Sequence, residues 1–152
     1  MFDVILRNGT VVTPHGTSRQ DVAISGEAIS AITSPDAIDN TQTKRSIDVN
    51  GKIVMPGGID PHVHCKWIMP MPDGTFGFTE GPEIVSRAAL YGGTTTLIDF
   101  AARIEDIPFS EVIEKRDHDW VGNCYCDYSY HLMLLGDVEP PVLSELEGLI
   151  GD

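Results

Sequence analysis

The stretch IVMPGGIDPHVHCK, residues 53–66, decides how the rest of the chain is interpreted. An apolar run ends at Gly57 and Gly58, and His62 and His64 follow two residues apart. In an extended strand the side chains of residues i and i+2 leave the same face, so both imidazoles should point one way. Neutral imidazole is a good ligand for zinc and similar transition metals. The spacing therefore predicts that His62 and His64 bind one divalent metal ion.

These two histidines make up only half of a catalytic zinc site, which usually has three protein ligands and an open position for water. A His-x-His pair also occurs as a surface or packing pair, so this alternative stays open. The context favours metal binding, because the pair ends a strand-like run and precedes an irregular segment. Catalytic residues at the carboxyl end of a barrel strand are presented in this way.

The segment 65–78 that follows the histidines shows neither helical nor strand periodicity. Structureless connections of about 12–15 residues are more often functional than not. We therefore expect a substrate-facing loop whose aromatic side chains, Trp67, Phe76 and Phe78, contact the substrate. The alternative is a loop that packs on a partner subunit, since exposed aromatic residues also mark interfaces.

Beyond this loop, helical and strand patterns alternate, which indicates an α/β fold with a parallel sheet. The pattern predicts helices at 82–91, 110–117 and 143–150, and strands at 53–64, 94–100 and 124–134. Residues 1–52 differ, because they read as short strands separated by turns, including a hairpin turn at Asn8-Gly9. We expect a small N-terminal β-sheet or β-sandwich domain at 1–52 and an α/β domain at 53–152.

Charge and composition exclude several functions. The net charge of −13 repels nucleic acid and anionic membranes, so neither is an expected partner. The sequence contains no apolar run of about 18 residues and no basic N-terminal leader, which predicts a cytoplasmic protein. Three cysteines, an odd number, argue against a disulfide framework.

Three blocks, IVMPGGIDPHVH, EIVSRAALYGGTTTLIDF and CDYSYHLML, occur in the order found in a known family. Together they resemble the N-terminal third of the cyclic amidohydrolases, in the dihydropyrimidinase and hydantoinase branch. The resemblance implies a (β/α)8 barrel of the TIM type, which needs about 250 residues. Residues 53–152 supply about three strand-helix units of roughly 30 residues each. We therefore expect part of a longer polypeptide, or a chain that another chain completes.

The resemblance also implies the chemistry. Such enzymes open the cyclic amide of a dihydropyrimidine or hydantoin-like ring with metal-activated hydroxide, using two divalent metal ions, commonly zinc. Family positions of the metal-binding His-x-His pair map onto His62 and His64, while the bridging lysine and the catalytic aspartate would lie beyond Asp152. The catalytic residues are thus unknown, and this chain alone is expected to be inactive. A homo-oligomer, by resemblance a tetramer, is expected.

Three further polar residues have two interpretations each. Asp60 can orient one of the histidines or make a turn hydrogen bond. Asp99 ends the second predicted strand and can line the mouth of the site or make a cap or salt bridge. His131 lies in the third predicted strand and can be a hydrogen-bonded core residue or a further residue of the site. For the chain as a whole, the alternative to an enzyme is a non-catalytic binding or assembly module of the same fold.

Overall fold

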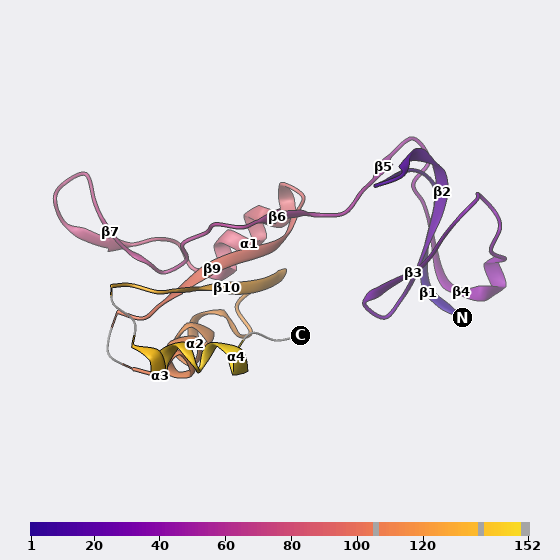
Figure 1. Cartoon of the computed structure of the whole chain (residues 1–152). Helices are drawn as coiled ribbons and strands as arrows, with labels where there is room; N and C mark the ends of the chain where they lie inside the picture. The colour runs from indigo at the N-terminus through magenta and orange to yellow at the C-terminus, as the bar shows by residue number, and fades with distance from the viewer. Residues whose placement is uncertain (105–106, 137–138, 150–152) are drawn as a thin grey trace. The chain divides into compact units, whose positions relative to one another are not determined.

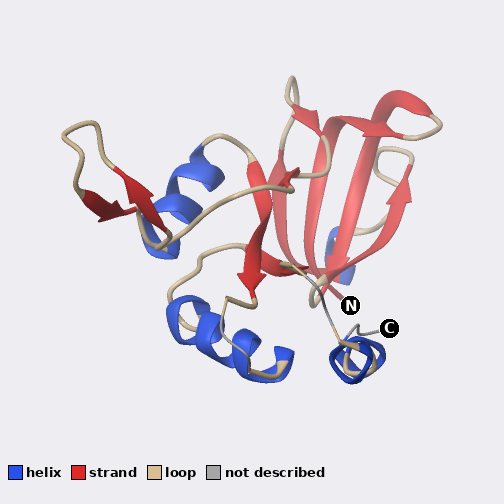
Figure 2. Ribbon diagram, turned by 60° about the vertical axis from the view of Figure 1, so that its left-hand side comes forward, coloured by secondary structure: helices blue, strands red, loops and turns tan. Residues whose placement is uncertain are grey.

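A computed structural model describes residues 1–104, 107–136 and 139–149 (Figure 1). The chain divides into two compact units, Met1–Pro56 and Gly57–Asp152. Strands and helices both contribute, with strands in the majority (Figure 2), so the expected mixed α/β class is confirmed. None of the described helices is long and apolar enough to cross a membrane.

The first unit is a five-stranded sheet. Its strands lie in the order β3-β2-β1-β4, and β5 also pairs with β1. The pairs β1–β2 and β2–β3 are antiparallel, whereas β4 and β5 run parallel to β1. The strands are β1 (Phe2–Thr13), β2 (Gly16–Ser25), β3 (Ala28–Thr33), β4 (Thr43–Asp48) and β5 (Ile53–Val54), and a 3-10 helix, η1, spans Asn40–Gln42.

Two groups of buried residues hold this sheet together. Ile5, Ala23 and Ile38 form an apolar cluster. Beside it, the guanidinium of Arg7 donates to the carboxylate of the fully buried Asp21 over 2.8 Å. An ion pair removed from water in this way holds a fixed geometry, and losing one partner leaves the other charge buried.

The expected hairpin turn at Asn8-Gly9 is wrong. Strand β1 continues through both residues, and the hairpin closes instead between Thr13 and Gly16. Asn8 has a φ of +64°, and the register of β1 against β2 shifts between Leu6 and Gly9. Asparagine tolerates this left-handed conformation, so the Asn-Gly pair forms a β-bulge here.

The single strand expected at 53–64 is split. Ile53 and Val54 form β5 and pair with Thr10 and Val11 of the first unit. Only β6, Gly58–Asp60, belongs to the sheet of the second unit. The proline and glycines between the two strands interrupt the pairing, since proline lacks the N–H that a ladder needs.

The second unit contains a parallel three-stranded sheet in the order β10-β9-β6. Its strands β9 and β10 span Thr94–Ala102 and Asp127–Met133. The helices are α1 (Pro82–Tyr91), α2 (Phe109–Trp120), α3 (Pro140–Leu143) and α4 (Leu146–Leu149). The helix expected at 143–150 is therefore two short helices, and its last residue, Ile150, lies outside the described residues.

Alternation along β9 separates the two faces of this sheet. Leu97, Asp99 and Ala101 are buried, whereas the residues between them are only partly buried. Leu97 packs with Cys65 and with Trp120 of α2 in the core of the unit. The buried face of β9 is therefore the face covered by helix α2.

The expectation of a structureless loop at 65–78 is also wrong. Strands β7 (Ile68–Pro70) and β8 (Phe76–Phe78) pair as an antiparallel hairpin. Its turn is closed by a hydrogen bond from the Met71 N–H to the Thr75 carbonyl oxygen, and Gly74 adopts a φ of +82°. Strands of three residues are too short to show a period of two, which is why the pattern went undetected.

Candidate functional site

The two histidines lie on an extended segment that directly follows β6. The Val63 N–H donates to the Ile98 carbonyl oxygen of β9 over 3.1 Å, which holds the segment alongside this strand. The Val63 side chain packs against the helix-side core formed by Cys65, Leu97 and Trp120. Because side chains alternate in extended backbone, His62 and His64 leave the opposite face.

The imidazoles converge on this face. The Nε2 atoms of His62 and His64 lie 3.1 Å apart, with the ring planes at 75°. The Phe100 ring stacks on His64 at 5.0 Å and meets His62 edge-on at 4.6 Å. Packing against one aromatic ring restricts both imidazoles, so the pair is held with its Nε2 atoms together.

These distances fit a shared metal ion. Two zinc–imidazole bonds of about 2.0–2.1 Å at a tetrahedral angle place their nitrogens about 3.3 Å apart. The observed 3.1 Å is close to this spacing, and it also allows one ring to donate a hydrogen bond to the other. The described residues contain no group of three or more His, Cys, Asp or Glu arranged to hold a metal. The pair thus fits as two ligands of an incomplete site.

Asp60 and His131 both make contacts to the backbone of this segment. Asp60 accepts a hydrogen bond from the His62 backbone N–H at 3.2 Å, as in a turn. His131 lies 2.8 Å from the Pro61 carbonyl oxygen through its Nε2 atom, and its ring packs on Phe100 at 5.0 Å. His131 is exposed rather than in the core. Both side chains therefore lie beside the histidine pair and contact the backbone of residues 61 and 62.

Asp99 lies on the other face of β9 and is fully buried. Its carboxylate accepts hydrogen bonds from the Cys65 backbone N–H at 3.1 Å and from the Trp67 indole N–H at 3.0 Å. Arg116 of helix α2 forms an ion pair with the same carboxylate. Asp99 thus acts as a salt-bridge and hydrogen-bond acceptor beneath the segment that carries the histidines.

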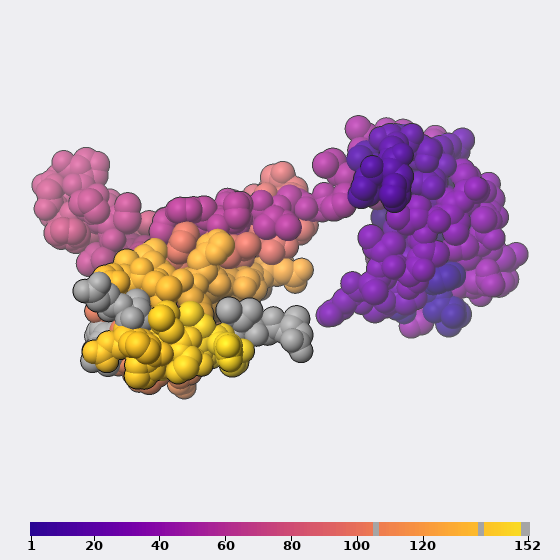
Figure 3. All heavy atoms as spheres, in the orientation of Figure 1, coloured from indigo at the N-terminus to yellow at the C-terminus, as the bar shows by residue number. Residues whose placement is uncertain are grey.

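Of the three predicted aromatic contacts, the structure places one beside the histidines. The Trp67 ring meets His64 edge-on at 4.9 Å. Phe76 and Phe78 lie on β8 with 70% and 74% of their surface exposed. The hairpin that carries them extends beyond the end of the second unit's sheet in Figure 1, and its atoms project from that unit in Figure 3. Whether any of the three contacts a substrate stays a prediction.

The cysteines of the second unit belong to its core. Burial, followed by the charge of Asp99, raises the pKa of the Cys65 thiol to about 12. Cys124 and Cys126 pack against the same cluster, and burial raises the pKa of the Cys126 thiol to about 11. Thiols with such pKa values stay protonated at neutral pH, which makes them poor metal ligands.

Sequence reasoning missed three residues around the pair: Phe100, Thr79 and Arg116. The Thr79 hydroxyl donates to the His64 carbonyl oxygen at 2.6 Å and accepts from the Trp67 backbone N–H at 2.9 Å. Phe100 directly follows Asp99, so period-two alternation along β9 places it on the histidine face. Thr79 and Arg116 are separated from the histidines by 15 or more residues, and no local pattern connects them.

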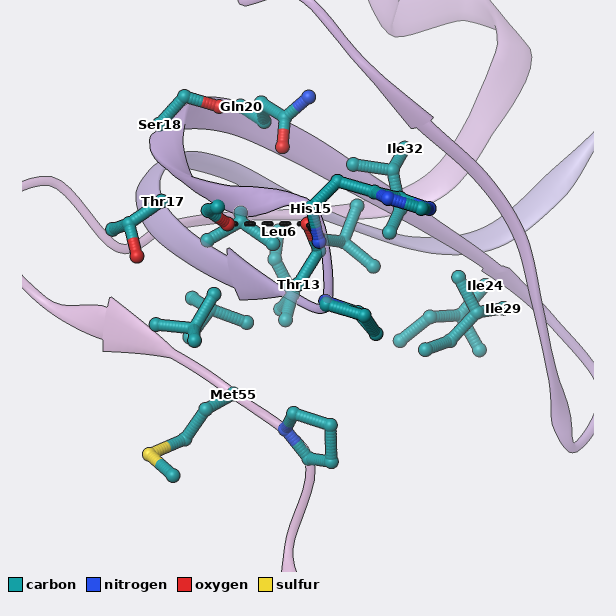
Figure 4. Close-up of a pocket in the computed structure, with 17 residues that line it drawn as sticks. Leu6, Thr13, His15, Thr17, Ser18, Gln20, Ile24, Ile29, Ile32 and Met55 are labelled. Carbon is teal, nitrogen blue, oxygen red and sulfur yellow. Dashed lines mark hydrogen bonds between the residues drawn. The ribbon is translucent and has the colours of Figure 1, made fainter.

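A cavity of about 830 Å³ lies in the first unit (Figure 4). Apolar side chains of the sheet line it, including Leu6, Ile24, Ile29 and Ile32. No predicted site residue contributes to it. The candidate site is therefore the histidine pair of the second unit.

Fold and site together define a class of protein: an α/β protein with a His-x-His pair at the carboxyl end of a parallel strand. No protein-family model matches the chain. The D-hydantoinases of Streptomyces coelicolor and Ralstonia pickettii are 34% and 35% identical over 148 residues. These alignments cover 96% and 97% of this chain but only 31% and 30% of the relatives.

Solved structures give the same result. The crystal structure of dihydropyrimidinase from Brevibacillus agri matches 98% of this chain at 36% identity, with a TM-score of 0.80, over 30% of its own length. The family resemblance is thus confirmed: the chain is a homologue of the hydantoinases and dihydropyrimidinases. It spans about 30% of the length of the relatives that it matches.

Proposed function

We propose that this chain forms part of a metal-dependent hydrolase that opens the amide bond of a small cyclic substrate, a dihydropyrimidine or a hydantoin-like ring. The observation that carries the proposal is the convergence of the His62 and His64 Nε2 atoms to 3.1 Å. Homology to proteins named D-hydantoinase and dihydropyrimidinase supports the substrate class.

In this proposal, His62 and His64 are two ligands in a centre of two divalent ions, and the imidazole ligands suit zinc. When bound, such ions supply Lewis acidity and make hydroxide available at neutral pH. The chain's own contribution is to hold both imidazoles on one face and to keep Phe100 against them. By resemblance to the family, a bridging lysine and a catalytic aspartate would complete such a centre, and no residue of this chain is assigned to either role.

The architecture proposed for the second unit is the start of a (β/α)8 barrel. Three features support it: the parallel order β10-β9-β6, helices between β6, β9 and β10, and site residues at the carboxyl ends of strands. A cytoplasmic homo-oligomer is part of the same proposal. Trp67, Phe76 and Phe78 are proposed to contact the ring substituent of the substrate.

A chimera tests this function. The 148 matching residues of the Streptomyces coelicolor D-hydantoinase are replaced by the corresponding residues of this chain. We expect the chimera to bind metal and to open hydantoin, and the double substitution His62→Asn and His64→Asn to abolish both. A His118→Asn chimera is the matched control, because it also replaces a histidine by asparagine but does so in the last turn of α2, outside the candidate site.

The opposite outcome would support the alternative of a binding or assembly module. A folded chimera that takes up metal equally with and without His62 and His64 would contradict the proposed metal site. A folded, metal-loaded chimera that opens no cyclic amide would contradict the proposed reaction.

A further inference from the structure

We infer that Asp99 is a positioning residue for the histidine pair, which it controls from the opposite face of the sheet through the backbone after His64 and through the ring of Trp67. This inference rests on the proposed function, because it assigns a residue to the same site. Asp99 itself touches neither imidazole in any described contact. Its effect must therefore pass through the groups that it holds.

The first path runs through the backbone. Asp99 accepts from the Cys65 N–H at 3.1 Å, and Arg116 donates to the Cys65 carbonyl oxygen at 3.0 Å. Both polar groups of the residue after His64 are thus held by one ion pair. Rotation of the His64 backbone would break these bonds inside a buried environment, where an unsatisfied polar group costs free energy.

The second path runs through Trp67. Its indole N–H donates to the Asp99 carboxylate at 3.0 Å, which fixes the orientation of the indole ring. That ring meets His64 edge-on at 4.9 Å, while the ring of Phe100, the residue after Asp99, stacks on His64 at 5.0 Å. His64 thus packs against two aromatic rings, of which Trp67 is held by the Asp99 carboxylate and Phe100 directly follows Asp99 in β9.

The charge balance favours this arrangement. Asp99 is fully buried, and a buried carboxylate needs a compensating charge. Arg116, whose side chain is 13% exposed, supplies it. Arg116 also pairs with Asp119 at 3.2 Å, near the surface. Arg116 therefore connects a buried carboxylate, which holds the backbone of Cys65 and the indole of Trp67, to a more exposed one, which pairs only with the Lys66 side chain of this segment, over 3.1 Å.

This difference provides matched variants. Asp99→Asn keeps the size of the side chain but removes the charge that holds the Cys65 N–H, the Trp67 N–H and Arg116. Asp119→Asn removes a partner of the same arginine and the ion pair to the Lys66 side chain, but it removes no hydrogen bond to the Cys65 backbone or to Trp67. Trp67→Phe removes one donor to Asp99 and keeps an aromatic ring, so it remains informative if Asp99→Asn does not fold.

The experiment uses the full chain with 15N-labelled histidine and two readouts: the ring-nitrogen resonances without metal, and titration with zinc chloride. For Asp99→Asn we expect shifted or broadened His64 resonances and a zinc affinity reduced about tenfold or more, the range seen for groups that orient metal ligands. Trp67→Phe should change both readouts in the same direction. Asp119→Asn should change neither by more than about twofold.

A folded Asp99→Asn protein with unchanged His64 resonances and zinc affinity would overturn the inference. If Asp99→Asn does not fold, a folded Trp67→Phe protein with unchanged His64 resonances would overturn the inference instead. Failure of the proposed function is distinguishable: the wild-type chain would then bind no zinc at His62 and His64. The metal-free resonances of His64 would still decide the role of Asp99.

Discussion

The backbone N–H of Val63 donates to the carbonyl oxygen of Ile98 across 3.1 Å. This bond lies between the two histidines in the sequence and holds their segment alongside β9. It turns Val63 toward the core under helix α2 and leaves His62 and His64 on the other face. The position of the candidate site therefore depends on the register of one extended segment against β9.

Phe100 should control how closely the two imidazoles are held, because its ring contacts His62, His64 and His131. Phe100→Ala frees these rings to rotate, and we expect the zinc affinity of the pair to fall about tenfold. Titration calorimetry with zinc measures this change. The control is Phe78→Ala on the exposed strand β8, and equal affinities of the two variants would contradict the prediction.

Asp21 should make the first unit acid-sensitive. Burial raises the pKa of this carboxyl, but hydrogen bonds from the Asn8 N–H, Arg7 and the Asp36 N–H outweigh burial and lower the pKa overall. The unfolded chain then binds a proton at a higher pH than the folded chain does. The stabilisation is present above the ordinary carboxyl pKa of about 4 and is lost as the pH falls through the lower folded pKa.

Asp21→Asn should remove this part of the acid sensitivity and should lower the free energy of unfolding at neutral pH by about 3–5 kcal/mol, because Arg7 stays buried without its partner. Urea unfolding followed by circular dichroism from neutral pH down to about pH 3 measures both effects. Asp36→Asn is the control, since Asp36 is exposed and its φ of +61° suits asparagine. A neutral-pH loss no larger than that of the control would refute the prediction.

Tyr130 should make the second unit sensitive to alkali. Its hydroxyl donates to Asp117 at 2.9 Å, and burial, together with that carboxylate, raises the pKa of Tyr130 above the usual value. The unfolded chain loses this proton near pH 10 whereas the folded chain keeps it, so stability falls as the pH rises above about 10.

Tyr130→Phe should flatten this alkaline decline and should cost about 1–2 kcal/mol at neutral pH, through the lost hydrogen bond. The measurement is urea unfolding at about pH 8 and about pH 11. Tyr91→Phe serves as the comparison, because the side chain of Tyr91 is 90% exposed. An alkaline decline identical in the wild type and in Tyr130→Phe would show that the proton on Tyr130 is not responsible.

Gly57 should tolerate no side chain. A Cβ atom there would lie 2.0 Å from the Thr95 Oγ1 atom and 2.7 Å from the Thr95 Cβ atom. Gly57→Ala must therefore push β9 away from the segment before β6, at a cost of about 1–3 kcal/mol. In Gly148→Ala, by contrast, the new Cβ meets no atom within 4 Å, and stability should not fall. Thermal unfolding compares the two variants; equal melting temperatures would contradict this packing.

Long periodic elements could be predicted from the sequence, whereas short and context-dependent ones could not. Strand β9 and helix α1 follow from β-branched residues at 94–96 and from the proline and glycines that bracket 82–91. The bulge at Asn8 has the same local sequence as a hairpin turn, and only pairing with β2 decides between them. The three-residue strands β7 and β8 exist because they pair with each other.

The candidate site likewise has a part that local sequence predicts and a part that depends on contacts between distant residues. That His62 and His64 leave the same face follows from alternation in extended backbone, and no distant residue is needed to predict it. The roles of Phe100, Thr79 and Arg116 depend on which strands and helices are neighbours. Arg116 reaches Asp99 only because helix α2 covers that face of the sheet. Such contacts between distant residues leave no local pattern in the sequence.

The most direct test of the central claim is a zinc titration of the chain with 15N-labelled histidine. We predict that the ring nitrogens of His62 and His64 respond together, with the weak affinity of a two-ligand site, while those of His15 and His118 do not move. Unresponsive His62 and His64 rings would contradict metal binding by the pair. Tight, stoichiometric zinc that survives dialysis against a chelator would contradict the conclusion that these residues form only half of a site.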